Sequence, residues 1–325
     1  MLSGKLKLTA AVAAMVMAPM GLTACGGVGG GSDAGGKVCD GVEAGSVDPT
    51  ALKGVTVTVG SKDFDEQLNL GALTIDMMCA AGATVKDHTN IKGTTQTRDA
   101  LLRGDIDVYW GYTGTGWVDF LKKQPIQDAA KQYDAVKKLD LRKNGVVWGP
   151  RAPFNNTYAF AVTNEFAKKH GINSDADMAK YLNANKGASV CVESEYANRP
   201  DGYPGFKKKY GIDGGKQKVL GTGVVYTQLD KGNCDFGEVF TTDGRIEALG
   251  LHVLTDDKSY HPLYNGAPVV MKDNKNGAAI LAVLKPLAAK LTTSVLQELN
   301  TEKSAQGEDP SKIAEDYLKK EGFLK

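Results

Sequence analysis

The chain has 325 residues, enough for one large domain or two ordinary ones. Apolar residues make up 42% of it and charged residues 24%, a composition typical of globular proteins. Its 39 Lys and Arg residues nearly balance 38 Asp and Glu residues, so no bulk field attracts nucleic acid or an anionic membrane, and any charge selectivity must be local to a site.

The first 25 residues have the features of an export signal. Lys5 and Lys7 precede an apolar run at 8–22 that is too short to span a bilayer stably. Residues 22–25, LTAC, resemble the lipobox of bacterial lipoproteins, in which the cysteine is lipidated after cleavage. An ordinary secretory signal with a chance cysteine is the alternative. We expect a lipoprotein signal peptide at 1–25 and a lipid on Cys25.

A flexible tether is predicted next, because residues 26–36, GGVGGGSDAGG, cannot pack. We assign 26–53 to this tether and an N-terminal segment. No later segment has 18 consecutive apolar residues, so the lipid is the expected membrane contact. The protein is therefore expected on the extracytoplasmic face of the cell membrane, which is the periplasm if there is an outer membrane.

Cysteine usage fits an oxidising compartment. An even number of cysteines follows the predicted anchor, namely Cys39, Cys79, Cys191 and Cys234. Three pairings are possible, and grouping along the sequence favours Cys39–Cys79 and Cys191–Cys234. Four buried free thiols are the alternative. No CxxC or HxxxH spacing occurs, so we expect no metal site and no cofactor.

From residue 54 onward, predicted strands and helices alternate. VTVTVG at 55–60 predicts a strand, Ser61 is a candidate helix cap, and apolar periodicity predicts a helix at 66–81. Further along come a strand near 83–88, a helix at 97–104, strands at 106–111, 157–162, 188–194 and 235–241, and a helix at 224–232. This order is typical of parallel strands with helices on both faces.

The two halves of the chain resemble each other. A constant offset superposes the stretch around ALLRGDIDVYWGYTGTG (100–116) on TQLDKGNCDFGEVFTTDG (227–244), so that Asp107 falls on Asp235 and Tyr112 on Phe240. Ligands of open α/β sheets bind beyond the carboxyl ends of the strands. Two related lobes would bring Tyr112 and Phe240 to one cleft.

The glycine-rich stretch WGYTGTGW at 110–117 has neither the GxxxxGK[ST] nor the GxGxxG spacing of phosphate loops. We interpret it as a tight turn that presents Tyr112; a plain turn is the alternative. Tyr158 and Tyr264 lie near the expected crossings between lobes, so an aromatic box is predicted from Tyr112, Tyr158, Phe240 and Tyr264. Ring faces bind a quaternary ammonium, which has no N–H to donate.

Three further residues are candidates for holding a ligand carboxylate: Lys62, Thr115 and Arg199. Arginine binds carboxylates through paired charge-assisted hydrogen bonds and lysine as a point charge. Solvated surface charges are the alternative for Lys62 and Arg199.

A set of motifs resembles the substrate-binding proteins of osmoprotectant ABC importers, the glycine betaine, choline and carnitine class. They are VGSKDFDEQLNLGAL (59–73), GTTQTRDALLRGDIDVYWGYTGTGW (93–117), NNTYAFAV (155–162), ANRPDGYPGF (197–206), FTTDGRI (240–246) and YNGAPVV (264–270). The resemblance covers 54–325 and implies an α/β, two-lobed periplasmic-binding-protein fold of type II. Its two crossovers would separate lobe 1, 54–155 plus 265–325, from lobe 2, 156–264.

The resemblance also implies roles for individual residues. A ligand in the inter-lobe cleft would have its trimethylammonium group at Tyr112, Tyr158 and Tyr264, and its carboxylate at Lys62, Thr115 and Arg199. The closed form would dock on a separate ABC permease. Phe240 departs from the family's usual tyrosine, and Asp65 stands where threonine is common. Which betaine is bound therefore stays open, with ergothioneine or another specialised betaine as the alternative.

Two rival functions belong to other classes. An exported choline-ester hydrolase would need a nucleophile beside a base, but the four histidines lie outside any nucleophile motif and GxSxG is absent. We therefore expect no enzyme. A receptor-type sensor that passes the closed state to a signalling partner is the second rival, which the sequence does not discriminate.

Overall fold

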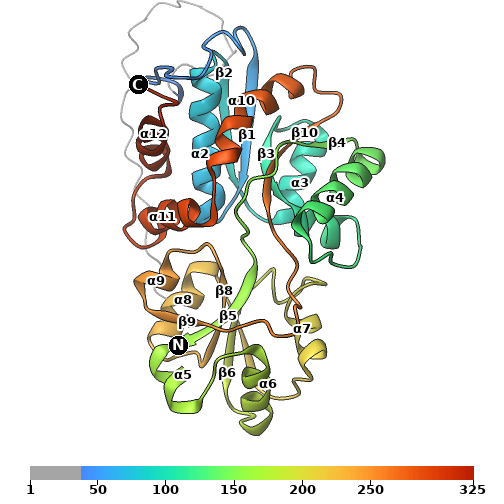
Figure 1. The fold of residues 1–325 in the computed structure, drawn as a ribbon, viewed down its shortest axis with the longest axis vertical. Helices are drawn as coiled ribbons and strands as arrows, with labels where there is room; N and C mark the ends of the chain where they lie inside the picture. The colour runs from blue at the N-terminus through green and yellow to red at the C-terminus, as the bar shows by residue number, and fades with distance from the viewer. Residues whose placement is uncertain (1–37) are drawn as a thin grey trace, which may run out of the picture. The chain divides into compact units, whose positions relative to one another are not determined.

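The computed structural model describes residues 38–325 (Figure 1), so the predicted signal peptide, Cys25 and the tether at 26–36 lie outside the described residues. Residues 38–53 pack against the C-terminal end of the chain. The amides of Gly45 and Ser46 donate to the carbonyls of Phe323 and Gly322, and Leu52 is buried. This N-terminal segment is thus part of the folded body.

One group of strands forms two small sheets, and we call the part built on it lobe 1. β1 (Thr56–Lys62) pairs in parallel with β2 (Thr84–Ile91), and a single bridge joins β1 to Val108, just before β3 (Tyr109–Tyr112). β10 (Gly266–Met271) lies antiparallel between β3 and β4 (Val146–Trp148). The helices of this part are α2 (Asp65–Ala80), α3 (Thr94–Arg103), α4 (Ala129–Asn144), α10 (Gly277–Lys290), α11 (Thr293–Ser304) and α12 (Pro310–Lys320), with a π-helical turn at Thr115–Phe120.

The second group is a five-stranded sheet, and we call the part built on it lobe 2. In spatial order its strands are β7 (Lys216–Leu220), β6 (Ser189–Glu193), β8 (Phe236–Phe240), β5 (Tyr158–Thr163) and β9 (Leu251–Val253). Its helices are α5 (Asn164–His170), α6 (Asp175–Ala184), α7 (Tyr203–Tyr210), α8 (Thr222–Asp230) and α9 (Arg245–Ala248).

Strand directions correct one expectation. β1 with β2 and β6 with β7 and β8 are parallel, as predicted, but β5 and β10 are antiparallel to their neighbours. Each of these two strands enters its sheet from the other lobe, and the alternation of elements within a lobe does not reveal the direction of entry. Figure 1 shows both strands leading out of the connecting segments.

Ser61 is a second correction, because it belongs to β1 and caps no helix. Its hydroxyl donates to the Lys62 carbonyl and accepts from the Asn90 amide, which extends the pairing of β1 with β2. α2 begins four residues later, after Phe64, which makes no side-chain cap.

Two connecting segments lie side by side between the lobes. Asn155 and Asn265 form an antiparallel bridge, and the Tyr264 amide donates to Asn155 Oδ1 over 2.6 Å. Asn265 Nδ2 in turn donates to the Phe154 carbonyl. The two crossings therefore hold each other in register at the point where the chain passes between lobes.

The repeat seen in the sequence has a structural counterpart. Asp107 Oδ2 accepts from the Thr58 amide over 2.8 Å, and Asp235 Oδ2 accepts from the Ser189 amide over 2.6 Å. Each aspartate thus ties the start of its own strand segment to the neighbouring strand. Tyr112 and Phe240 follow these aspartates at the same spacing and are the last residues of β3 and β8.

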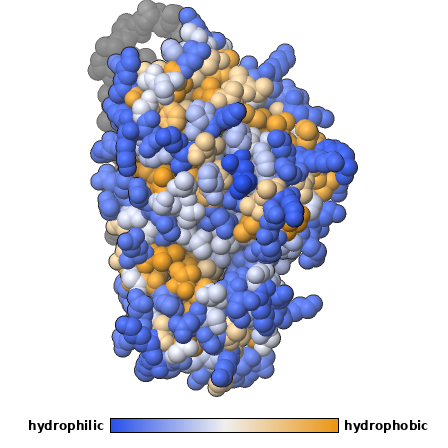
Figure 2. All heavy atoms as spheres, in the orientation of Figure 1, coloured by the Kyte–Doolittle hydropathy of each residue, from blue (hydrophilic) through white to orange (hydrophobic). Residues whose placement is uncertain are grey.

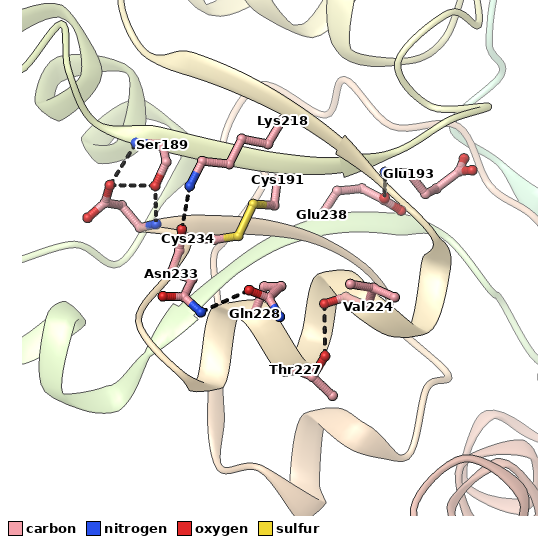
Figure 3. Close-up of a disulfide and its surroundings, with 11 residues drawn as sticks. Ser189, Cys191, Glu193, Lys218, Val224, Thr227, Gln228, Asn233, Cys234 and Glu238 are labelled. Atoms are coloured by element: carbon pink, nitrogen blue, oxygen red, sulfur yellow. Dashed lines mark hydrogen bonds between the residues drawn. A yellow bond between two sulfur atoms is a disulfide. The ribbon is translucent and has the colours of Figure 1, made fainter.

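Both predicted disulfides are confirmed. Cys39–Cys79, with Cα atoms 5.3 Å apart, fixes the N-terminal segment to α2. Figure 3 shows Cys191–Cys234, which joins β6 to the turn before β8 over a Cα separation of 5.9 Å. Nearby, Lys218 Nζ of β7 donates to the Asn233 carbonyl, so that turn is held from both sides.

Figure 2 shows one face of the molecule, which is mainly hydrophilic and has a hydrophobic patch in its lower half. Val219 and Val224 are the most exposed large apolar residues of the described chain, at 53% and 46%. Within residues 38–325 no single helix is long and apolar enough to cross a membrane; α10 with α11 reaches that length and composition as a pair bent by 94°.

Removing the Cys191–Cys234 bond should destabilise the fold without unfolding it. The bond closes a loop with a sequence separation of 43, so replacing both cysteines with alanine should lower the free energy of unfolding by about 2–4 kcal/mol. Urea denaturation of the double variant and the parent under oxidising conditions measures the difference. Coincident denaturation curves would contradict the prediction.

Candidate functional site

A cavity of about 640 Å³ lies between the lobes and is lined by residues from both. Strand ends supply much of its wall. Lys62 and Tyr112 stand at the carboxyl ends of β1 and β3, Phe240 at the carboxyl end of β8, and Tyr158 at the start of β5. This is where open α/β sheets hold ligands.

The four aromatic residues predicted for the box all line this cavity: Tyr112, Tyr158, Phe240 and Tyr264. The ring centroid of Tyr158 lies 5.0 Å from that of Phe240 and 5.3 Å from that of Tyr264, which it meets edge to face at 88°. The structure thus brings residues from both lobes and a crossing into one aromatic wall.

Phe64 is a fifth aromatic residue of the wall, which the sequence analysis missed. Its ring stacks on Phe240 at 5.6 Å and 7°, and on Tyr112 at 6.2 Å and 26°. Phe64 therefore links the aromatic residues of the two lobes. Phe64 lies two residues after the end of β1, so it could have been predicted from the sequence, as Tyr112 was, by its place at the end of a strand.

The stretch WGYTGTGW does not form the expected tight turn. β3 runs instead into the π-helical turn at Thr115–Phe120, and Gly114 has a φ of −62°, which any residue adopts. Its glycine is needed for space, because a Cβ there would lie 2.7 Å from the Tyr264 ring and 2.8 Å from the Leu263 carbonyl. Gly114 thereby allows Tyr264 to pack beside Tyr112.

A buried carboxylate joins the segments around the cavity. Glu66, 3% exposed, accepts hydrogen bonds from Tyr112 Oη over 2.6 Å, Thr242 Oγ1 over 2.5 Å, Asn156 Nδ2 over 2.9 Å and Asn300 Nδ2 over 3.0 Å. These donors come from β3, lobe 2, a crossing and α11. Burial raises the pKa of Glu66 despite these bonds.

Lys62 is placed as a binding cation would be. Its side chain is buried, its Nζ lies 5.1 Å from the centroid of the Tyr112 ring, and within residues 38–325 Nζ has no hydrogen-bond partner. Burial lowers its pKa to about 8, against the attraction of Glu195. The ammonium is therefore available to a ligand in the cavity.

Arg199 lies elsewhere than the other predicted polar residues. Thr115 lines the cavity with Lys62, but Arg199 is outside the lining and forms a two-pronged pair with Asp201, both N–O distances being 2.9 Å. Its guanidinium lies 5.8 Å from the Tyr158 ring, and Tyr264 Oη donates to Asp201. Its Nη1 lies 3.9 Å from Oε2 of Glu195, a lining residue, so Arg199 adjoins both the aromatic wall and the acidic lining.

Charged contacts cross between the lobes at the cavity. Glu195 of lobe 2 accepts from both the amide and the hydroxyl of Thr94, each over 2.7 Å, and so caps α3 of lobe 1. Burial opposes its ionisation, but Lys62 and Thr94 hold the pKa of Glu195 below its ordinary value. Asp65, the second family departure, lies 3.3 Å from Arg245 of lobe 2.

The lining is acidic as well as aromatic. Six carboxylates line it, Asp63, Asp65, Glu66, Glu193, Glu195 and Asp243, against three basic side chains, Lys62, Lys92 and Arg245. Such a field favours a small cationic group. None of the chain's four histidines is among the lining residues, so the lining offers no histidine base for a nucleophile.

Two strand groups, two adjacent crossings and an inter-lobe cavity define a two-lobed solute-binding protein, as predicted. Residues 55–320 match the model of the substrate binding domain of ABC-type glycine betaine transport systems, and the chain belongs to this family. The glycine-betaine-binding protein of Pseudomonas aeruginosa is 35% identical over 278 residues, covering 83% of this chain and 89% of that one.

Two further relatives agree with this assignment. The glycine betaine-binding protein YehZ of Escherichia coli is 32% identical, covering 83% of this chain and 92% of that one. A solved structure described as a glycine betaine/carnitine/choline ABC transporter has 31% identity and a TM-score of 0.68, covering 82% of this chain and 99% of that one.

Replacing Glu66 with glutamine should weaken the cavity wall. The glutamine amide would offer one acceptor oxygen, and its NH2 group would face the donors that now bond the second oxygen of Glu66. Each buried donor left without a partner should lower the free energy of unfolding by about 1–3 kcal/mol. We expect a lower midpoint of thermal unfolding. Glu302→Gln, a partly exposed change on α11, is the control. Equal midpoints for the two variants would show that Glu66 contributes little.

Proposed function

We propose that this protein captures a quaternary-ammonium compound, of the glycine betaine, choline and carnitine class, and delivers it to an ABC permease. The observation that carries the proposal is the cavity wall, where five aromatic side chains stand among six carboxylates. A ring face contributes about 0.5–2 kcal/mol to cation binding, so several faces supply much of the roughly −8 kcal/mol of micromolar affinity.

The methylated cation and the carboxylate of the ligand would be bound by different residues. Tyr112, Tyr158, Phe240 and Tyr264 would surround the methylated cation, with Phe64 closing the wall between the lobes. A carboxylate, where the ligand has one, would face Lys62 and Thr115. We assign Arg199 an indirect part, because its pairing with Asp201 holds Tyr264 in place.

Closure would follow from the contacts that cross the cleft. The lobes, with boundaries at 54–155 plus 265–325 and 156–264, would move about the paired crossings at Asn155 and Asn265. The hydrogen bond from Thr94 to Glu195 and the ion pair of Arg245 with Asp65 would form as the lobes meet. The closed form would then dock on the permease.

The chain's location would follow from its N-terminus. We propose that Cys25 is lipidated after removal of the signal peptide and holds the binding protein on the extracytoplasmic side of the membrane. We also propose that the ligand is bound without conversion, and mass spectrometry of ligand recovered after incubation tests this point.

Calorimetric titration of the ligand-stripped protein with glycine betaine, choline, carnitine, proline betaine and ergothioneine tests the function. Tyr158 supplies a matched pair of variants. Tyr158→Phe keeps the ring face and should bind almost like the parent, whereas Tyr158→Leu keeps bulk without the face and should bind at least about tenfold more weakly. Binding of no compound in the parent would overturn the function; equal affinities of the two variants would overturn the aromatic box.

The pH dependence of binding tests the role of Lys62. Its pKa of about 8 means that the free protein loses the ammonium charge as the pH rises through that value. A carboxylate ligand binds the charged form, so glycine betaine affinity should be fully present below the pKa and fall above it, by up to about tenfold per pH unit. Choline, which lacks a carboxylate, should show no such loss.

Calorimetry from about pH 7 to about pH 9.5 spans this transition. Lys62→Gln is the control, because it should bind glycine betaine weakly and with no dependence on pH. A glycine betaine affinity that stays constant across the range in the parent would show that Lys62 does not hold the carboxylate.

A further inference from the structure

A cluster of three metal-ligating side chains lies in lobe 2, away from the lining of the inter-lobe cavity. Asp175 is the first residue of α6, and Asp256 and His261 belong to the segment between β9 and β10. One ligand atom from each lies within 4.8 Å of the other two. Asp175 is far from the other two residues in the sequence, so no metal-binding spacing in the sequence indicates the cluster.

Asp175 is buried without a partner. Its side chain belongs to a residue that is 1% exposed, and neither carboxylate oxygen has a hydrogen-bond partner within residues 38–325. Although it begins a helix, the neighbouring amides donate elsewhere, Ala176 to Asp257 and Asp177 to Ser174. A carboxylate in this state costs several kcal/mol unless a cation or a proton compensates it, about what a buried unpaired ion costs elsewhere.

His261 presents a ring nitrogen to the same point. It is 5% exposed, its Nε2 lies 2.7 Å from Tyr196 Oη, and its Nδ1 faces Asp256 Oδ2 at 3.3 Å without the geometry of a hydrogen bond. With the proton on Nε2 donated to Tyr196, Nδ1 keeps its lone pair. A second hydrogen bond of this kind is the usual way in which a metal-binding histidine is oriented.

Asp256 completes the cluster. Its Oδ2 lies 3.3 Å from His261 Nδ1, the separation of about 3.3 Å expected for two ligands each 2.0 Å from a tetrahedral zinc ion. Tyr210 Oη donates to its Oδ1 and the His261 amide to its Oδ2, which fixes the carboxylate. Its side chain is 22% exposed, so the cluster has a route to solvent.

Acidic side chains gather at this point without a lysine or arginine paired to them. Asp175, Asp256 and the neighbouring Asp257 lie together, and within residues 38–325 no lysine or arginine forms an ion pair with any of them. Lys258, the nearest lysine in the sequence, places its Nζ 4.8 Å from the Tyr210 ring and 3.3 Å from the Lys209 carbonyl. A divalent cation would supply the missing charge.

We propose that Asp175, Asp256 and His261 bind a divalent transition-metal ion, with zinc as the best fit. One imidazole and two carboxylates match the ligands of zinc sites, and water from the Asp256 side would complete the coordination. The ion fixes the segment that carries Asp256 and His261 to the start of α6. That segment continues to Tyr264, and the Tyr196 ring lies 4.7 Å from that of Tyr158, so the site braces the aromatic wall.

Zinc titration of the full chain tests this proposal. The protein is prepared without a polyhistidine tag, stripped with EDTA and transferred to metal-free buffer. We expect saturable binding of one Zn²⁺ per chain by calorimetry and metal analysis, and a higher midpoint of thermal unfolding with Zn²⁺. No saturable binding would overturn the proposal, and Asp175 would then hold a proton instead.

Variants locate the bound ion. Asp175→Asn and His261→Gln should each weaken Zn²⁺ binding by at least about tenfold, while Asp134→Asn, an exposed carboxylate on α4, should leave it unchanged. Near-UV circular dichroism checks that each variant is folded. Zinc affinity that is unchanged in a folded Asp175→Asn variant would place the ion elsewhere and overturn the site. The outcome is independent of any betaine titration.

Discussion

The arrangement around the cavity depends on the buried carboxylate of Glu66. A buried carboxylate is costly unless hydrogen bonds satisfy its oxygens, and here the four donors come from separate parts of the chain. The network is complete only when α2, β3, the first crossing, α11 and Thr242 of lobe 2 meet. The position of the Tyr112 ring and the approach of the lobes are therefore coupled through one side chain.

The charged side chains of the site differ in whether they face the cavity or are paired beside it. Charges that face the cavity are largely acidic, whereas Arg199, next to the lining, is paired with Asp201. A cation in the cavity would therefore meet ring faces and an acidic field, and the buried ammonium of Lys62 lies beside the Tyr112 ring.

Sequence reasoning succeeded where local chemistry decides the outcome. The alternation of strands and helices and the placement of Tyr112 and Phe240 at strand ends were predicted because hydrophobic periodicity acts within short stretches. Both disulfides were predicted because each joins cysteines of the same half of the chain. Sequence reasoning failed for Ser61, which was interpreted as a helix cap, and for the directions of β5 and β10, which are antiparallel to their neighbours. Their structure is set by a neighbouring strand or by the other lobe.

The sequence by itself determined the family, the strands and helices that carry the cavity's Lys62, Tyr112 and Phe240, and the aromatic residues available for a site. Only the tertiary structure decided how individual residues are used: Phe64 and Glu66 became part of the cavity wall, Arg199 paired with Asp201 beside it, and Gly114 proved necessary for space beside Tyr264. The physical reason is that a charged side chain, or the space left by a glycine, acts only through the residues that it contacts. The partners of Glu66 and of Gly114 lie tens to hundreds of residues away and meet only when the chain is folded.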